Sequence, residues 1–175
     1  MKVNISNLSQ GTHDYELSKN AVELGLAENF GGDVAAKVVV EKSSRQIYLR
    51  ANIAASATFQ CDRCLSEFNH NISTVLQTLY VWNADDRSGS EDENIRPLAP
   101  DVNIIDISDD VRDLVLLAVP LKLLCREECA GLCPRCGKNL NTVAGARCDC
   151  SPREIDSRWN KLAVLAEVAV KRKRV

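Results

Sequence analysis

The sequence predicts an α+β fold with an antiparallel, β-rich, small barrel-like body, a few helices and a cysteine-rich C-terminal segment. Three observations support this fold class. Alternating and β-branched apolar residues fill the first half of the chain, two later stretches carry helical apolar stripes, and six of the eight cysteines fall within residues 125–150. We therefore expect a body over residues 1–124 and a cysteine-rich segment over residues 125–175.

Strands are predicted throughout the first half of the chain. Ile47, Leu49 and Ala51 alternate with polar side chains, which is typical of a strand with one buried face. The preceding residues are rich in β-branched side chains, and Ser43-Ser44 can turn the chain between the two segments, so a hairpin is expected. The predicted strands are residues 2–5, 34–42, 46–59 and 66–82, the last with Ile72, Val75, Leu79 and Val81 among its apolar positions.

Helices are expected at three places. A short one over residues 19–26 has Ser18 as a plausible N-cap. A second helix, over residues 108–119, would be capped by Ser108 and ended by Pro120. Its apolar stripe comprises Val111, Leu114, Val115 and Ala118, a short strand over residues 102–106 precedes it, and a C-terminal helix is expected over residues 154–171.

Charge is distributed unevenly along a chain whose net charge is only −2. Residues 83–100 are acidic, contain Gly, Ser and Pro, and are predicted to be a mobile loop. Residues 85–113 hold ten acidic side chains against three basic ones, whereas residues 153–175 hold seven basic against three acidic. This balance excludes a protein that coats nucleic acid by bulk charge, and any such contact must come from local patches.

The location is expected to be cytoplasmic. No stretch reaches the roughly 20 apolar residues that span a bilayer, and the first residues do not resemble a signal peptide. No membrane association is therefore expected. In a reducing compartment disulfides are rare, and closely spaced cysteines more often bind metal or do redox work.

The cysteine spacing predicts structural zinc. Cys133-Pro-Arg-Cys136-Gly137 has the form of a zinc knuckle, in which a tight CxxC turn directs two thiolates at one point. Eight cysteines make two sets of four, and a closed set of four is the structural type of zinc site. The better supported set is Cys133, Cys136, Cys148 and Cys150, and the second set is Cys61, Cys64, Cys125 and Cys129.

Other interpretations of the cysteines stay open. With six cysteines so close in sequence, Cys129 could exchange into the first set. Cys61 and Cys64 could also form a dithiol redox pair, handle metal, or be two buried cysteines. No βαβ unit surrounds this CxxC as a thioredoxin-like fold requires, which disfavours the redox pair. A nuclease would need a histidine or carboxylate cluster, and His13 and His70 are expected to be surface residues. We therefore predict that the protein is not an enzyme.

Basic side chains within and beside the cysteine-rich segment are candidates for contact with RNA or a partner. Zinc knuckles often hold such residues against phosphates or unpaired bases, although interleaved acidic residues dilute the field here. A solvated surface of mixed charge is the competing interpretation. The candidates are Lys122, Arg126, Arg135, Lys138, Arg147 and Arg158.

Several motifs in order resemble the YceD family, the large ribosomal RNA subunit accumulation proteins. The resemblance covers roughly residues 45–165, and the last helix departs from it, with Asp156-Ser157-Arg158 where Asp-Pro-Arg is expected. The motifs are Cys61-Asp-Arg-Cys64-Leu65 with Phe68, Val111-Arg-Asp-Leu114 ending at Pro120, Cys125-x₃-Cys129-Ala-Gly-Leu-Cys133-Pro-Arg-Cys136-Gly-Lys-Asn139-Leu-Asn141, Cys148-Asp-Cys150, and Ile155-Asp-Ser-Arg158-Trp159.

The resemblance implies a role in accumulation of large-subunit ribosomal RNA in bacteria and plastids. We therefore expect a non-enzymatic ribosome-biogenesis factor that supports 23S rRNA processing and 50S assembly through contact with precursor rRNA or a ribosomal protein. The resemblance supplies no catalytic residue, no molecular mechanism and no oligomeric state. The alternatives are the dithiol redox or metal-handling protein and an adaptor that touches no RNA.

Overall fold

The computed structural model describes residues 1–82, 95–99, 101–142, 148 and 150. The chain forms two compact units, residues 1–129 and residues 130–175. The predicted helix over residues 154–171 lies outside the described residues, as do Arg147, Arg158 and most of the predicted acidic loop. No helix within the described part of the chain is long and apolar enough to cross a bilayer.

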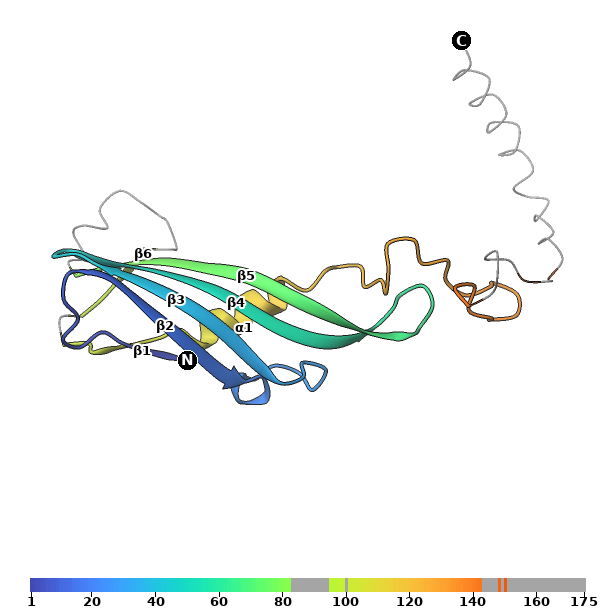
Figure 1. The fold of residues 1–175 in the computed structure, drawn as a ribbon, viewed down its shortest axis with the longest axis horizontal. Coiled ribbons are helices and arrows are strands. Elements are labelled where there is room, and N and C mark those ends of the chain that lie inside the picture. The colour runs from blue at the N-terminus through green and yellow to red at the C-terminus, as the bar shows by residue number, and fades with distance from the viewer. Residues whose placement is uncertain (83–94, 100, 143–147, 149, 151–175) are drawn as a thin grey trace, which may run out of the picture. The chain divides into compact units, whose positions relative to one another are not determined.

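The first unit is built on one five-stranded sheet in the order β2-β3-β4-β5-β6 (Figure 1). Neighbouring strands are antiparallel from β2 to β5, while the short β6 pairs parallel with the end of β5. The strands are β2 (Gly11–Asn20), β3 (Asp33–Lys42), β4 (Gln46–Gln60), β5 (Glu67–Val81) and β6 (Ile95–Pro97). The three long strands predicted from residues 34–42, 46–59 and 66–82 are thus confirmed, each to within a residue or so.

One face of the sheet is buried, as alternation predicted. Ile47, Leu49 and Ala51 of β4 are fully buried, and their neighbours in sequence are half-buried or exposed. In β5 the inward side chains are Ile72, Leu76 and Tyr80. The apolar positions predicted for β5 mix two faces, because Val75 and Leu79 have the opposite parity and lie on the outer face.

A helix and a second, two-stranded sheet cover the buried face. Helix α1 (Ser108–Leu117) buries Val111 and Val115 and contacts β4 and β5. Strands β1 (Lys2–Asn4) and β7 (Ile104–Asp106) pair antiparallel and contribute Val3 and Ile105 to the same core. The guanidinium of Arg96 on β6 donates to both carboxylate oxygens of Asp110 on α1, at 2.7 and 2.6 Å.

The structure corrects the ends of α1. The N-cap is Ile107 rather than Ser108, and no side chain caps the helix. Instead the carboxylate of Asp106 accepts a hydrogen bond from the Ser108 amide at 2.9 Å. The helix ends with Leu117, before Pro120 and two residues earlier than expected.

The helix predicted over residues 19–26 is wrong. Its first residues continue strand β2, and only a single 3-10 turn forms at Val22–Leu24. Gly25 follows with a φ of 78°, a left-handed conformation that terminates the turn. The helical spacing of Val22 and Leu26 was misleading. Residues 11–20 pair with β3 along their whole length, so few residues remain for a helix before Gly25.

The barrel-like body also needs correction, because the described strands form an open sheet. Strand β2 lies at one end of the strand order and β6 at the other, and they are not neighbours. The parallel pairing of β6 with Leu79–Val81 further shows that the predicted loop 83–100 contains a strand. The predicted strand over residues 102–106 is confirmed in shortened form as β7.

Candidate metal centres

The turn that joins β4 to β5 carries the first CxxC. The amide of Cys61 donates to the carbonyl of Ser66, and the amide of Leu65 donates to the carbonyl of Cys61, both at 2.9 Å. Leu65 has a φ of 58°, a left-handed conformation that is rare for a side chain of this size. The tight turn this creates places Cys61 and Cys64 on one side of the hairpin tip.

The segment after α1 supplies two more thiols to the same place. Two hydrogen bonds join Asp62 to this segment. The Asp62 amide donates to the Leu123 carbonyl at 2.8 Å, and the Asp62 carboxylate accepts from the Leu123 amide at 2.7 Å. The guanidinium of Arg63 donates to the carbonyl of Cys129 at 2.8 Å. The two residues between the cysteines of the CxxC thus tie the segment to the hairpin independently of the thiols.

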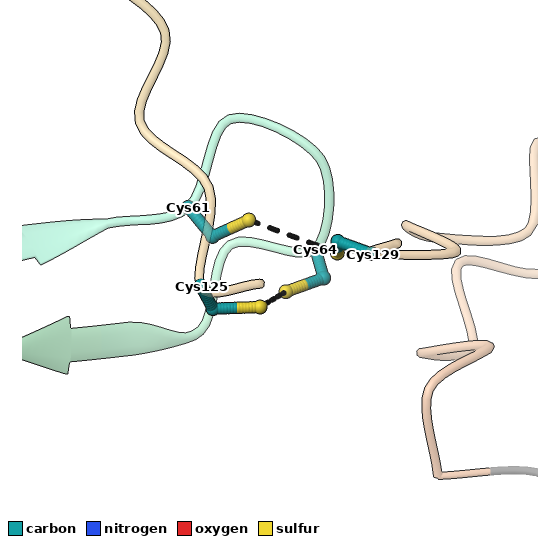
Figure 2. Close-up of side chains that lie close together, drawn as sticks. All are labelled: Cys61, Cys64, Cys125 and Cys129. Carbon is teal, nitrogen blue, oxygen red and sulfur yellow. Dashed lines mark hydrogen bonds between the residues drawn. The ribbon is translucent and has the colours of Figure 1, made fainter. Parts of the chain in front are cut away.

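Cys61, Cys64, Cys125 and Cys129 form the first cysteine cluster. Figure 2 shows the side chains of the hairpin pair meeting those of the later pair. The sulfurs of Cys61 and Cys129 are 3.8 Å apart, those of Cys64 and Cys125 are 3.6 Å apart, and all four lie within 4.8 Å of one another. Three of the four residues are buried, and Cys125 is half-buried.

The second cysteine cluster comprises Cys133, Cys136, Cys148 and Cys150, and it lies in the second unit. Its sulfurs also lie within 4.8 Å of one another, with 3.1 Å between those of Cys133 and Cys148. Only Cys133 is buried, and Cys136 is exposed. The structure therefore groups the eight thiols as two sets of four, the grouping favoured by the spacing.

The CxxC turns of the two clusters have the same backbone pattern. In the second cluster the amide of Gly137 donates to the Cys133 carbonyl at 2.9 Å, and the amide of Cys133 donates to the Lys138 carbonyl at 2.8 Å. Gly137 has a φ of 70°, so it occupies the position that Leu65 takes in the first turn. The amide of Arg135 also donates to the sulfur of Cys133 at 3.4 Å, which stabilises negative charge there.

The donor sets fit a tetrahedral metal ion. A zinc–sulfur bond of about 2.3 Å gives a tetrahedron whose sulfur–sulfur edges are about 3.8 Å. The distances of 3.8 and 3.6 Å in the first cluster match these edges, and 3.1 Å in the second is somewhat shorter. None of these pairs approaches the roughly 2.05 Å of a disulfide bond. Four thiols without a carboxylate or imidazole are typical of zinc or an iron–sulfur cluster.

The thiols of the first cluster have displaced pKa values. Burial by itself raises the pKa of Cys61, but hydrogen bonds from the backbone of Cys125, Cys64 and Arg63 outweigh it and lower the pKa to about 6. Burial, followed by hydrogen bonding with neighbouring thiols, raises the pKa of Cys125 to about 12. One thiol thus ionises readily because backbone amides stabilise its negative charge, while another resists ionisation chiefly because it is buried.

The second cluster repeats this contrast. Backbone hydrogen bonds from Cys136 and Arg135 lower the pKa of Cys133 to about 6. Hydrogen bonding with Cys148 and Cys136, with a smaller effect of burial, raises the pKa of Cys150 to about 12. A dication among the four sulfurs would favour the thiolate form of every one of them.

The basic residues singled out from the sequence lie at exposed positions where the structure describes them. Lys122 and Arg126 belong to the first unit, and Arg135 and Lys138 belong to the second. Sequence reasoning missed Asp62, Arg63 and Leu65, whose roles depend on the fold. One signal for Leu65 was available, since it follows a CxxC as Gly137 does.

The two histidines are not part of any catalytic arrangement among the described residues. Nε2 of His13 lies 3.0 Å from the carbonyl oxygen of Ser9. The ring of His70 is half-buried, with its centroid 6.4 Å from those of Phe59 and Phe68. Neither histidine belongs to a set of potential metal ligands within the part of the chain that the structure describes.

Comparison with known proteins identifies a family. The family model described as "Large ribosomal RNA subunit accumulation protein YceD" matches residues 49–166, about two thirds of the chain. The matched range contains all eight cysteines, both CxxC turns and α1. No solved structure matches the chain.

Curated relatives come from mycobacteria and plants. An uncharacterized protein of Mycobacterium tuberculosis is 34% identical over 125 residues, which cover 70% of this chain and 57% of the relative. The chloroplastic YCED homolog 1 of Arabidopsis thaliana, named a large ribosomal RNA subunit accumulation protein, is 26% identical over 78% of this chain and 50% of its own length. The like-named protein of Zea mays is 45% identical over 51 residues, which cover 29% of this chain and 17% of that protein. The chain thus spans about half the length of the first two relatives.

Proposed function

Because the chain belongs to the YceD family of large ribosomal RNA subunit accumulation proteins, we propose that it is a non-enzymatic ribosome-biogenesis factor. It supports accumulation and processing of 23S rRNA and assembly of the 50S subunit, in the bacterial cytoplasm. The observation that carries this proposal is the family match over residues 49–166, together with the plant relative named for the same role.

The metal in both clusters is zinc, and its role is structural. A closed set of four thiolates leaves no coordination position for water or substrate, so the ion supplies stability rather than chemistry. The first cluster fastens the β4–β5 hairpin tip to the segment after α1, and the second organises a segment with few apolar side chains. Each cluster thereby fixes the surface around it.

Contact with precursor rRNA or with a ribosomal protein occurs through those fixed surfaces. Lys122 and Arg126 are exposed beside the first cluster, and Arg135 and Lys138 are exposed within the CxxC turn of the second. A rigid turn that presents basic side chains loses little conformational entropy when it binds phosphates. Arg147 and Arg158 complete the proposed set of contact residues.

The proposal is tested by depletion in the organism that carries the gene. We expect 23S rRNA and 50S subunits to fall relative to 16S rRNA and 30S subunits, and the full chain to restore them. The tagged protein should co-sediment with large-subunit precursors. Normal 23S rRNA levels after complete depletion would falsify the proposed role.

The competing function is that of a dithiol redox or metal-handling protein acting through Cys61 and Cys64. The lowered pKa of Cys61 favours it, because thiolate is the reactive form. The complete burial of Cys61 opposes it, because a redox partner must reach the sulfur. A reductase activity that Cys61→Ser abolishes, while bound zinc stays unchanged, would establish this function instead.

A further inference from the structure

The outer face of the five-stranded sheet, opposite α1 and the β1–β7 pair, contains two hollows of about 400 and about 380 Å³. Alternation directs the even-numbered side chains of β4 outward, because its odd-numbered side chains are buried or half-buried. Asn52 and Ala54 line the first hollow, and Ser56 and Thr58 line the second. Both hollows therefore lie on the same face and follow one another along β4, and together we call them the β4 trough.

The neighbouring strands complete the first hollow. The register places Ala54 between Ala35 of β3 and Ser73 of β5, and these three short side chains form the floor. Lys37 of β3 and Val75 of β5 lie on either side of the next outward position of β4. Neighbouring strands are about 4.8 Å apart, so β3 and β5 are about 10 Å from each other. This width suits one extended strand rather than a double helix.

The second hollow is lined by amide and hydroxyl groups. The hydroxyl of Thr58 donates to Oδ1 of Asn69 at 2.9 Å, which leaves the NH₂ group of Asn69 to donate to a ligand. The hydroxyl of Ser56 donates to the Gly31 carbonyl at 3.3 Å, so its oxygen can still accept. Asn71 is exposed and lies opposite Ser56 in the register. The hollow thus offers both donors and acceptors, and none of its lining side chains is charged.

The charge of the outer face differs between its two halves. Residues 46–60 and 68–82, which include nearly all of β4 and β5, contain no Asp or Glu, and Arg50 is their only charged side chain. Arg50 is exposed, and no ion pair joins it to another described residue. The half formed by β4 and β5 therefore favours an anion. The outward acidic side chains belong to β2 and β3, and they are Asp14, Glu16 and Glu41.

These groups match the chemistry of an unpaired RNA strand. Arg50 and Lys37 are diagonal neighbours in the register, about 7 Å apart, and each can neutralise a phosphate. Lys37 lies 3.5 Å from Glu16, but both side chains are more than three quarters exposed, so this pair is weak and Lys37 can turn to a ligand. Asparagine amides hydrogen-bond base edges, and amides and hydroxyls also bind the ribose 2′-hydroxyl.

We propose that the β4 trough binds single-stranded RNA, with Arg50 and Lys37 on its phosphates and the amides of Asn52, Asn69 and Asn71 on its bases and ribose hydroxyls. The inference rests on the proposed function, because it names the form of ribosomal RNA that the protein contacts. It adds a site on the sheet, apart from the basic residues beside the cysteine clusters.

The test measures binding of a fluorescein-labelled RNA strand of about twelve A and C nucleotides to the full, zinc-loaded chain by anisotropy. Arg50→Met is expected to weaken binding several-fold and to reduce the slope of log K against log salt by about 0.7, because one phosphate contact is lost. Arg50→Lys should retain the slope, because it retains the charge. Ala54→Val raises the floor of the trough without changing the charge, and it should weaken binding at an unchanged slope.

Matched controls separate the trough from general charge and from added bulk. Lys2→Met removes an exposed lysine from β1, on the other side of the sheet, and it should leave affinity unchanged. Ser18→Val adds bulk at an exposed outward position of β2, in line with Ala54 but beyond β3, and it should also leave affinity unchanged. A DNA strand of the same sequence, which lacks the 2′-hydroxyl, and the RNA duplex should both bind more weakly.

The outcomes separate the inference from the function on which it rests. If either Arg50→Met or Ala54→Val leaves wild-type binding unchanged, or if Lys2→Met weakens it as much as Arg50→Met, the trough is not the site, although RNA contact remains. Equal affinity for the DNA strand or the duplex overturns the assignment to single-stranded RNA. A chain that binds no RNA strand, but whose depletion lowers 23S rRNA, overturns the trough and favours a ribosomal protein as the partner. Binding that both variants weaken, with normal 23S rRNA after depletion, supports the trough and removes the proposed function.

Discussion

The two cysteine clusters share a turn but differ in what supports it. Both CxxC turns have the same pair of backbone hydrogen bonds and a left-handed residue after the second cysteine. The first cluster is mostly buried and is tied by Asp62 and Arg63 to the segment that brings its second pair of thiols. The second is more exposed, in a unit where buried positions are few among the described residues.

This difference indicates how much each site would depend on the proposed zinc ion. In the first cluster the sheet, the hairpin and the hydrogen bonds to Leu123 bring the thiols together even without metal. In the second, the thiols themselves are the main link between residues 133–136 and residues 148–150 among the described contacts. Zinc should therefore complete a preformed first site and fold the second.

Replacing one cysteine in each cluster should have the greatest effect on bound zinc and on local stability. Cys64→Ser and Cys136→Ser should each remove one zinc ion per chain, counted by native mass spectrometry. Because structural zinc contributes on the order of 10 kcal/mol to small folds that depend on it, Cys136→Ser should expose the Gly137 amide to rapid hydrogen exchange. Cys64→Ser should leave exchange in β3, β4 and most of β5 protected. Equal loss of protection around both turns would refute the contrast between the sites.

A smaller effect on zinc affinity is expected from removing the hydrogen bond between Asp62 and Leu123 beside the first cluster. Asp62→Ala removes the carboxylate that accepts from the Leu123 amide at 2.7 Å, and should weaken zinc binding at the first site by about 2 kcal/mol. Asp62→Asn keeps an acceptor and should recover about half of this loss. Competition with a chelator measures both. Zinc in the second cluster serves as the internal control, and its affinity should not change.

The residue after each CxxC gives a reciprocal test. Gly137→Ala forces a side chain into a left-handed conformation and should destabilise the second site by about 1 kcal/mol, although its Cβ would meet no atom within 4 Å. Leu65→Gly relieves the same conformation in the first turn, and since Leu65 is 55% exposed it loses little burial. Zinc affinity at the first site should therefore rise or stay constant. A large loss would mean that Leu65 contributes packing that outweighs its backbone strain.

The smallest effect on stability is expected from a substitution in the first unit that lies outside both clusters. Hydrogen bonds from the Ser108 hydroxyl and amide, with the nearby N-terminal amine, outweigh burial and lower the pKa of Asp106 to about 2. The carboxylate therefore stabilises the fold above its ordinary pKa of about 3.9, and this contribution is lost as pH falls towards 2. Because the side chain is 48% exposed, Asp106→Asn should cost less than about 1 kcal/mol at neutral pH.

Chemical denaturation of the zinc-loaded protein measures that cost. If the stability of the first unit contributes to zinc affinity at the first site, Asp106→Asn should weaken that affinity by no more free energy than the unit loses in its free energy of unfolding. The second site, which lies in the other unit, should be unaffected. The acid-induced loss of stability between about pH 4 and 2 should be smaller in Asp106→Asn than in the unaltered chain.

Strand prediction succeeded where side chains alternate and failed where they do not. Residues 46–59 gave β4 because Ile47, Leu49 and Ala51 mark one face. Residues 11–20 lacked such a signal, since only Tyr15 and Leu17 are large and apolar there and neither is fully buried. This strand is specified by its pairing with β3, a long-range contact that local sequence does not reveal.

The clusters show the same division between local and distant information. The CxxC spacing was enough to predict two tight turns that each direct two thiols to one place, because a tight turn determines where neighbouring thiols point. The tie between Asp62 and Leu123 joins residues 61 positions apart, and no pattern in the sequence indicates it.

Sequence alone was enough to predict the long central strands, the helix after the acidic region, the YceD resemblance and the two CxxC turns. These features depend on residues close together in the chain, where alternation, helical spacing and turn geometry act directly. Tertiary structure alone decided that the sheet is open and that Cys125 and Cys129 meet the hairpin tip. Those features depend on burying one face of the sheet beneath α1 and β1–β7, which places distant segments side by side.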